Sequence, residues 1–436
     1  MQIHVVQSGQ TLYGIARTYG ISVADLSAAN QINPIQTLVI GQALVIPISG
    51  MYYFVQPGDT LYKIGRRFGV NHLRLAQMNA INPIDPLQIG FRLYIPPAPK
   101  TPVESNAYVE AVNGRFTDAA TSAVVEHAPL LTYLAPFSFE ARPDGSLATF
   151  DVSPIKGASA GSGAVLMMAV TNLENGQFSD AVGEAILNDT SVQDVLLDHI
   201  IEAAGEYGFQ DIHFDFEYLR PEDREPYNAF LKKAAQRLHA ERLLISTALA
   251  PKTSASQTGQ WYTAHDYRAH GEIVDFVVIM TYEWGYSAGP PMAVSPIGPV
   301  RQVLEYAKTE IPANKIMMGQ NLYGYDWTLP FVKGGAYARA ISPQTAISLA
   351  RENHAFIEYD YTAQAPFFYY RDASQKQHVV WFEDARSIQA KFDLLKELSL
   401  RGVSYWRLGW DFPQNWLLLE DRFCLLYTSP SPRDRT

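Results

Sequence analysis

The chain has 436 residues, 47% of them hydrophobic and 18% charged, and its formal net charge is −10. That length predicts one large domain with smaller ones beside it, and because neither half has the dense basic stripe that nucleic-acid binding requires, we expect no nucleic-acid partner. No apolar run approaches the ~20 residues of a membrane span, the start of the chain (Met1 to Val6) lacks the features of a signal peptide, and the single cysteine, Cys424, excludes disulfides within the chain.

Two consecutive segments, residues 1–48 and 50–98, are copies of each other in a constant register without a gap. Each copy has a short β run, two stretches with helical spacing, an Asn-Pro turn and a closing Ile-Pro strand, which predicts the order β-α-α-β. This order, with Gly and Asn-Pro at the turns, resembles the LysM module, which binds N-acetylglucosamine polymers such as peptidoglycan and chitin.

The LysM resemblance implies that the sugar lies between the first turn and the Asn-Pro loop of each copy. Glycine and Asn-Pro also shape turns in the absence of a ligand. The repeated pattern as a whole nevertheless favours carbohydrate binding. The residues implied are Gly9, Gln10, Thr11, Ile32 and Asn33 in the first copy, and Gly58, Asp59, Thr60, Ile81 and Asn82 in the second.

After the copies, residues 99–105 read as a stiff, Pro-rich linker that holds the two parts of the chain apart. In the following segment, residues 106–423, eight apolar β-like runs alternate with helical stretches, which predicts an α/β fold of the (β/α)8 TIM-barrel type. The stretch from about 339 to 383 is too long for one crossover and predicts a small inserted α+β subdomain beside the cleft. The eight runs are Ala107 to Ala111, Leu130 to Phe137, Ala164 to Thr171, Asp211 to Glu217, Leu243 to Leu249, Phe276 to Tyr282, Lys315 to Tyr323 and Val403 to Leu408.

The fourth run is unusual because four ionisable residues alternate with four apolar ones. Successive side chains of a strand point to opposite faces, so Asp211, His213, Asp215 and Glu217 share one face. At ~3.3 Å per residue, Asp215 and Glu217 lie roughly 6–7 Å apart at their backbones. Neighbouring carboxyl groups drive their pKa values apart, so that one remains a proton donor while the other is charged. The run therefore predicts a hydrolase.

The sequence Asp215-Phe-Glu-Tyr218 after an apolar strand resembles the Asp-x-Glu end of the family 18 glycoside hydrolase motif. The family pattern places acidic residues at three positions before the glutamate, and two of these are Gln210 and His213 here. The resemblance implies that Glu217 is the proton donor and that Asp215 stabilises the intermediate. His213 is interpreted as a hydrogen-bonded residue of the pocket that orients Asp215.

Other strand ends complete the resemblance. Met280-Thr-Tyr-Glu-Trp284 resembles the family's Met-x-Tyr-Asp, so Tyr282 is implied to hold the substrate acetamide, with Glu283 in place of the aspartate. Trp406 takes the place of the family's aromatic floor under the reacting sugar. Further candidates for substrate binding are Trp284, Tyr323, Asn172 and Glu110.

The implied chemistry is substrate-assisted, retaining hydrolysis, in which the acetamide of the sugar acts as the nucleophile and no cofactor or metal takes part. A metal hydrolase is an alternative, since Asp211, His213, Asp215 and Glu217 are all ligand types. One extended strand, however, does not wrap four ligands around an ion. A non-catalytic lectin is the other alternative, but lectins of this family usually lack the glutamate that this chain retains.

The combination of two LysM copies with these motifs resembles bacterial spore-cortex-lytic N-acetylglucosaminidases up to about Phe423. It implies cortex peptidoglycan as the partner, a monomer, and synthesis in the mother cell without a signal peptide, followed by placement at the coat and cortex of the spore. A chitinase, acting on chitin, is the second hypothesis. Residues 424–436 break the composition abruptly and are interpreted as a non-native tail.

Overall fold

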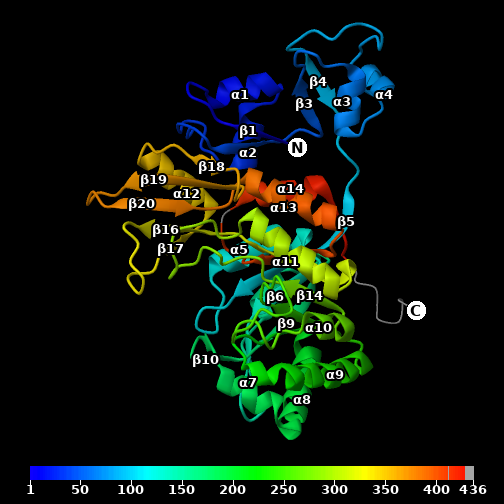
Figure 1. Ribbon diagram of the computed structural model, residues 1–436, viewed down its shortest axis with the longest axis vertical. Coiled ribbons are helices and arrows are strands. Elements are labelled where there is room, and N and C mark those ends of the chain that lie inside the picture. Colours follow the sequence, from blue (N-terminus) through cyan, green and yellow to red (C-terminus); the bar gives the residue numbers. More distant parts are fainter. Residues whose placement is uncertain (411, 428–436) are drawn as a thin grey trace.

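Each copy at the amino terminus forms a small β-α-α-β unit, as the sequence predicts (Figure 1). The repeated residues explain the repeated structure: Thr11 and Thr60 cap the first helix of each unit, and Gly20 and Gly69 end it in the left-handed conformation. We call residues 1–48 the first module and residues 50–98 the second module. Their elements are β1 (Gln2–Val5), α1 (Leu12–Tyr19), α2 (Val23–Asn30) and β2 (Ala43–Ile46), then β3 (Met51–Phe54), α3 (Leu61–Phe68), α4 (His72–Met78) and β4 (Arg92–Ile95).

The computed structural model describes residues 1–410 and 412–427, and its largest part is a closed barrel of eight parallel strands. The barrel closes because β12 pairs with β9 on one side and with β13 on the other. All eight predicted runs contribute a strand, so the predicted (β/α)8 barrel is confirmed. The strands are β5 (Thr101–Glu110), β6 (Tyr133–Phe137), β9 (Val165–Thr171), β12 (Asp211–Asp215), β13 (Leu244–Leu249), β14 (Phe276–Ile279), β15 (Ile316–Asn321) and β21 (Gly402–Trp406).

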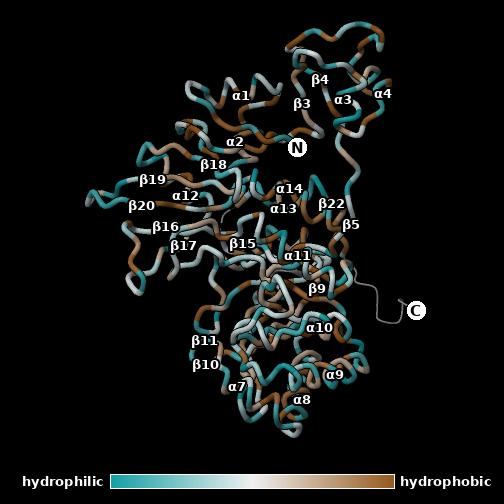
Figure 2. Tube along the Cα trace, viewed as in Figure 1, coloured by the Kyte–Doolittle hydropathy of each residue, from teal (hydrophilic) through white to brown (hydrophobic). Residues whose placement is uncertain are grey.

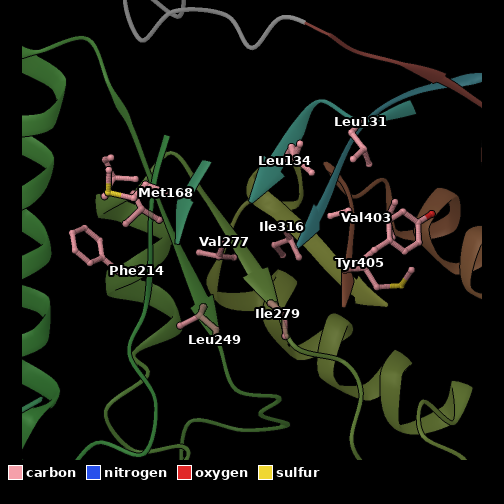
Figure 3. Close-up of a cluster of buried hydrophobic side chains, with 14 of the residues drawn as sticks. Leu131, Leu134, Met168, Phe214, Leu249, Val277, Ile279, Ile316, Val403 and Tyr405 are labelled. Atoms are coloured by element: carbon pink, nitrogen blue, oxygen red, sulfur yellow. The ribbon is translucent and has the colours of Figure 1, made fainter. Parts of the chain in front are cut away.

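Helices surround the barrel, and hydrophilic residues follow the outer helices (Figure 2). Successive residues of a barrel strand alternate between two hydrophobic cores, one between the barrel and its helices and one inside the barrel. In β14, Val277 and Ile279 pack toward the helices (Figure 3), whereas Phe276 and Val278 pack inside the barrel. The helices are α5 (Asp118–His127), α6 (Ser153–Ala158), α7 (Asp180–Leu187), α8 (Thr190–Tyr207), α9 (Arg224–Ala240), α10 (Tyr267–Ile273), α11 (Ile297–Glu310), α13 (Ala385–Leu398) and α14 (Pro413–Arg422), and short strands β7 (Phe139–Ala141), β8 (Leu147–Ala148), β10 (Leu173–Glu174) and β11 (Gln177–Phe178) lie in the loops.

The inserted subdomain begins earlier in the chain than predicted. A separate five-stranded antiparallel sheet with one helix starts directly after β15, at Gly324 rather than near residue 339. The first strand of this sheet follows β15 after two residues and contains Tyr325 and Trp327, so no polar stretch in the sequence marks its start. Its elements are β16 (Gly324–Thr328), β17 (Arg339–Ile341), α12 (Pro343–Glu352), β18 (Glu358–Asp360), β19 (Ala365–Arg371) and β20 (Gln377–Trp381).

The predicted linker does not hold the first module apart from the barrel. Strand β5 already begins at Thr101, and the first module packs on the inserted subdomain and on α14 (Figure 1). The backbone N–H of Ile357 donates to the carbonyl of Ile40 at 2.9 Å, and Val39 is buried among apolar residues of the subdomain. The prediction of separated parts is therefore wrong for this module, because a docking surface is not visible in the composition of a linker.

The carboxyl-terminal segment also differs from its prediction. Residues Phe423–Leu425 form β22, which pairs with β5 at Thr101 to Val103, so the first part of the predicted tail joins the fold. The rest of the predicted tail, residues 428–436, lies outside the described residues. Among the residues that are described, no helix is long and apolar enough to cross a bilayer.

Candidate active site

A cavity of about 1300 Å³ opens at the carboxyl ends of the barrel strands. Acidic and aromatic side chains from separate strand ends meet there, as expected for this fold. The predicted residues that line the cavity are Glu110, Asp215, Glu217, Tyr282, Glu283, Tyr323 and Trp406. Trp410 lines it as well, and the structure adds Tyr108, Phe137, Trp261, Tyr262, Tyr325 and Arg407.

Glu217 lies two residues beyond the end of β12, where its backbone is held by Asn172. The Asn172 amide donates to the Glu217 carbonyl at 2.8 Å and accepts the Glu217 N–H at 2.9 Å. Asn172 is fully buried and does not line the cavity. The prediction that Asn172 contacts substrate is therefore wrong, because its polar atoms already position the backbone of Glu217.

Asp215 and Glu217 are electrostatically linked. Burial raises the pKa of Asp215 to about 7, and burial together with the charge of Asp215 raises the pKa of Glu217 well above its usual range. Glu217 thus retains a proton at neutral pH, which a general acid requires. One carboxyl oxygen of Asp215, Oδ1, is buried without a hydrogen-bond partner. A buried carboxyl oxygen without a partner adds to the burial cost that raises the pKa of this group.

His213 lies below the cavity in a hydrogen-bonded chain. Its ring nitrogens contact the Tyr108 hydroxyl and Ser246 Oγ, each at 2.8 Å, and Ser246 donates to Asp211 at 2.6 Å. Because Ser246 donates to Asp211, Nδ1 of His213 carries the proton and Nε2 accepts from Tyr108. Burial lowers the pKa of His213 to about 3, so the ring is neutral.

The position of His213 corrects two parts of its interpretation. His213 does not line the cavity, so the prediction that it binds substrate is wrong. No hydrogen bond joins it to Asp215 among the described residues, and Tyr108 is the group that connects it to the cavity. Tyr108 was missed because it belongs to the first strand, far from the motif in sequence. Gln210 lies before β12, at the opposite end from the cavity.

Tyr282 lines the cavity and stands beside a cluster of tyrosines that hold Glu283. The hydroxyl of Tyr323 donates to Glu283, and that of Tyr325 donates to the same carboxyl at 3.0 Å. Burial raises the pKa of Tyr282 well above its usual value, which keeps its hydroxyl protonated as a donor. Trp284 is placed differently, since it lines an adjoining pocket of about 600 Å³ that shares Tyr282 and Glu283 with the main cavity.

Trp406 forms an aromatic wall of the cavity with Tyr108 and Phe137. Its ring centroid lies 5.4 Å from that of Tyr108 and 4.9 Å from that of Phe137, which fixes the indole in place. Glu110 also faces the cavity, and its carboxylate pairs with Arg407 at 2.7 Å. Such an aromatic face with polar neighbours suits the apolar face and the hydroxyl groups of a sugar ring.

The predicted sugar-binding positions of the modules are mostly exposed turns. Gln10 and Asp59 brace these turns by accepting the backbone N–H of Gln7 and Gln56, and Thr11 and Thr60 serve as helix caps. Ile32 is buried in the core of the first module, so its side chain does not face a ligand. The remaining predicted positions are Gly9 and Asn33, which are exposed, and Gly58, Ile81 and Asn82, of which Ile81 is partly buried.

Two isoleucines next to these loops were not predicted. Ile35 and Ile84 follow the Asn-Pro turns and are 90% and 85% exposed. They occupy the same position in the two copies. Their place beside the predicted sugar-binding loops makes them candidates for an apolar contact with a sugar. The presence of an isoleucine at the same position in both copies was the sequence signal that could have identified them.

The described residues hold no group of three or more His, Cys, Asp or Glu side chains arranged to bind a metal ion. His213 and Ser246 engage Asp211 and Tyr108 instead. A (β/α)8 barrel with a protonated acid beside a second carboxyl, in a cleft walled by aromatic rings, is the site of a glycoside hydrolase.

Comparisons with known proteins give the family. Residues 138–411 match Glycosyl hydrolases family 18, and residues 4–47 and 53–96 match the LysM domain. The chain belongs to family 18 of the glycosyl hydrolases and carries two LysM domains, which confirms the resemblance of its motifs.

Relatives extend over the whole chain. The Cortical fragment-lytic enzyme of Bacillus subtilis is 64% identical over 97% of this chain and 98% of its own length. The crystal structure of the spore cortex-lytic enzyme SleL of Bacillus megaterium has 54% identity and a TM-score of 0.91, covering 98% of this chain and 99% of that one. A chitinase of Chromobacterium violaceum, with 23% identity and a TM-score of 0.67, covers 73% of this chain and 98% of its own, and shares the fold.

Proposed function

We propose that this protein is a spore-cortex peptidoglycan hydrolase that cleaves the β-1,4 bond after N-acetylglucosamine by a retaining, substrate-assisted mechanism. The observation that carries the proposal is the pair of Asp215 and Glu217 in the cavity, where burial and the charge of Asp215 raise the pKa of Glu217 well above its usual range. The printed names of the relatives, Cortical fragment-lytic enzyme and spore cortex-lytic enzyme, support the choice of cortex.

In the first step, protonated Glu217 donates its proton to the glycosidic oxygen. The bond between that oxygen and the anomeric carbon breaks, and the departing sugar leaves with a free hydroxyl. The carbonyl oxygen of the substrate's own acetamide attacks the same carbon, so no enzyme nucleophile is needed. Trp406 supports the reacting sugar from one side of the cavity.

The intermediate is a positively charged oxazolinium ring, and the cavity holds groups of the right kind to stabilise it. The carboxylate of Asp215, which lines the cavity, supplies a negative charge. The hydroxyl of Tyr282 donates to the acetamide oxygen and holds it in line with the anomeric carbon. Substrates without an N-acetyl group at this position therefore do not react.

In the second step, water attacks the anomeric carbon, and the Glu217 carboxylate accepts the proton of that water. The oxazolinium ring opens, the acetamide is restored, and Glu217 regains the proton that it started with. Two successive inversions at one carbon retain its configuration. The product ends in a reducing N-acetylglucosamine.

The two LysM modules would hold the glycan strand near this cavity. LysM domains bind the same class of polymer that the proposed reaction requires. We place the protein at the interface of coat and cortex in the spore, acting as a monomer on peptidoglycan strands.

The proposal is tested by mass spectrometry of soluble products after incubation with cortex peptidoglycan and, separately, with chitin. The Glu217→Gln variant is the matched control, since it keeps the size of the side chain and removes the acid. Fragments from cortex that end in reducing N-acetylglucosamine, absent with the variant, are the expected result.

Two other outcomes would replace the proposal. Chitobiose from chitin without products from cortex would make the protein a chitinase. No products from either polymer, with wild type and variant bound equally, would make it a lectin-like glycan-binding protein of the spore surface.

A further inference from the structure

The second module differs from the first in charge although it shares its fold. The first module contains one basic residue, Arg17, and one acidic residue, Asp25, whereas the second contains five basic and two acidic residues. The rest of the chain is strongly acidic. The excess positive charge is therefore confined to one small unit. Its basic residues are Lys63, Arg66, Arg67, Arg74 and Arg92.

Three of these residues form a continuous stripe on α3, which we call the basic stripe: Lys63, Arg66 and Arg67. Residues at i, i+3 and i+4 lie on one face of a helix, and all three are exposed. The first module has Gly14 and Thr18 where the second has Lys63 and Arg67. The stripe is therefore an addition that the fold of the module does not require.

The contacts of the basic stripe include no close ion pair with an acidic group in the described residues. Lys63 Nζ donates to the carbonyl of Gly58 at 2.9 Å, and the Arg67 guanidinium lies 5.4 Å from the ring centroid of Tyr53. Neither contact involves a carboxylate. Within the described part of the chain, no ion pair joins any of the three residues to an acidic group. Asp59, on the adjacent turn, accepts hydrogen bonds from Tyr53 and Gln56, and Arg67 and Lys63 attract it at longer range without forming a close ion pair.

The bond from Lys63 to Gly58 places one end of the stripe on the glycan-binding turn of the same module. In peptidoglycan, every peptide branch leaves from a sugar of the glycan strand and carries free carboxylates. A strand bound at Gly58 would bring its branches alongside α3. An acidic partner also matches the sign of the stripe, while chitin, which is neutral and unbranched, has nothing for it to bind.

We propose that the basic stripe binds the carboxylates of the peptide branches on a glycan strand held by the second module. This inference rests on the proposed glycan binding of the modules. It makes retention on peptidoglycan dependent on salt, because exposed charge pairs are screened within a Debye length of about 8–10 Å at ordinary ionic strength. The stripe thereby gives the module a higher affinity for peptidoglycan than for chitin, although the sugar-binding site is the same for both.

The test measures retention of the full chain on insoluble cortex peptidoglycan, in a Glu217→Gln background that prevents digestion. Three forms are compared: the parent, the triple variant Lys63→Gln, Arg66→Gln and Arg67→Gln, and the control Arg17→Gln. Glutamine keeps the helix propensity. Arg17 is the matched control because it occupies the position of Arg66 in the first module. Each form is also tested on peptidoglycan whose carboxylates are blocked as neutral amides, and on chitin.

We expect the triple variant to bind native peptidoglycan roughly five- to tenfold more weakly than the parent, as three exposed charge pairs predict. Blocking the carboxylates should weaken the parent equally and leave the triple variant unchanged, and Arg17→Gln should behave as the parent. Equal binding of parent and triple variant to native peptidoglycan would overturn the inference while leaving glycan binding intact. Failure of the parent to bind any polymer would overturn the glycan-binding proposal itself, and this inference with it.

Discussion

The two modules share a repeated sequence pattern and a fold, but they pack against different parts of the molecule. The first is packed on the inserted subdomain and on α14, and apolar residues such as Val39 and Val45 are buried there. The second contacts the first through Gln2 and Tyr52, and it lies above the barrel, to which a short stretch of chain joins it at β5 (Figure 1). The duplicated domain is thus packed on the inserted subdomain in one copy, whereas the other copy contacts the first module.

The sharpest test of this difference uses a pair of equivalent glycines. Gly41 and Gly90 both have positive φ, +85° and +82°, but a Cβ on Gly41 would lie 1.8 Å from the Ile357 carbonyl oxygen, whereas a Cβ on Gly90 would meet nothing within 4 Å. We expect Gly90→Ala to lower the free energy of unfolding by about 1–2 kcal/mol through the left-handed backbone. Gly41→Ala should lower it by about 3–4 kcal/mol because the clash is added. Calorimetry of the full chain measures both, and equal losses would mean that the first module is undocked in solution.

A second pair of equivalent positions tests the apolar part of the docking surface. Val39 is 4% exposed, while its counterpart Gln88 is exposed. We expect Val39→Ala to reduce the free energy of unfolding by about 1.5–2 kcal/mol through lost burial, and Gln88→Ala to change it by less than about 0.5 kcal/mol. Urea unfolding followed by tryptophan fluorescence gives the values. A cost at Gln88 as large as that at Val39 would contradict the asymmetry.

A third test asks where the modules should behave alike. Ile35 and Ile84 are almost equally exposed beside the two Asn-Pro turns. Changing either to serine should leave stability unaltered and weaken retention on chitin about fourfold, as expected for losing one methylene-sized apolar contact with the sugar. Pull-down on insoluble chitin with Glu217→Gln as the background measures this. If neither variant binds more weakly, these side chains take no part in binding the glycan.

The smallest expected difference concerns the first turns. The pKa of Asp59 is lowered mainly by the hydrogen bond from the Tyr53 hydroxyl and next by the one from the Gln56 backbone N–H. The equivalent residue of the first module is Gln10, which does not titrate. A lowered folded-state pKa stabilises the turn above the usual pKa of an aspartate, and this contribution is lost as the pH falls through the lower folded value. An NMR titration should show the Gly58 amide shifting below about pH 4 and the Gly9 amide remaining constant. Parallel shifts of both amides would contradict the assignment.

The repeat and the barrel could be predicted from the sequence because they depend on local periodicity. Each βααβ unit is encoded by its own caps and turns, and each barrel strand by its own apolar run. The start of the inserted subdomain at Gly324 and the docking of Ile40 on Ile357 depend on contacts between distant segments. The sequence pattern of one segment does not indicate which distant segment it will contact.

The same reasoning explains the outcome at the site. Asp215, Glu217, Tyr282 and Trp406 line the cavity because strand ends meet there in any barrel of this kind. Asn172 and His213 also lie at or near strand ends, but their polar atoms are consumed by Glu217 and by Tyr108 and Ser246. Alternation along a strand predicts the face on which a side chain lies. It does not predict whether the polar atoms of that side chain are already hydrogen-bonded to other protein groups.

The short connection between β4 and β5 has a kinetic consequence. Only Pro96 to Lys100 separate these strands, a reach of at most about 17 Å. A glycan strand released from the cavity of the barrel would therefore stay at high effective concentration while the second module still holds it, and rebinding would precede escape. Residence on the insoluble polymer should then far exceed the lifetime of either single contact. The length of the Pro96 to Lys100 segment would then determine how many glycosidic bonds the enzyme hydrolyses before it dissociates from the polymer.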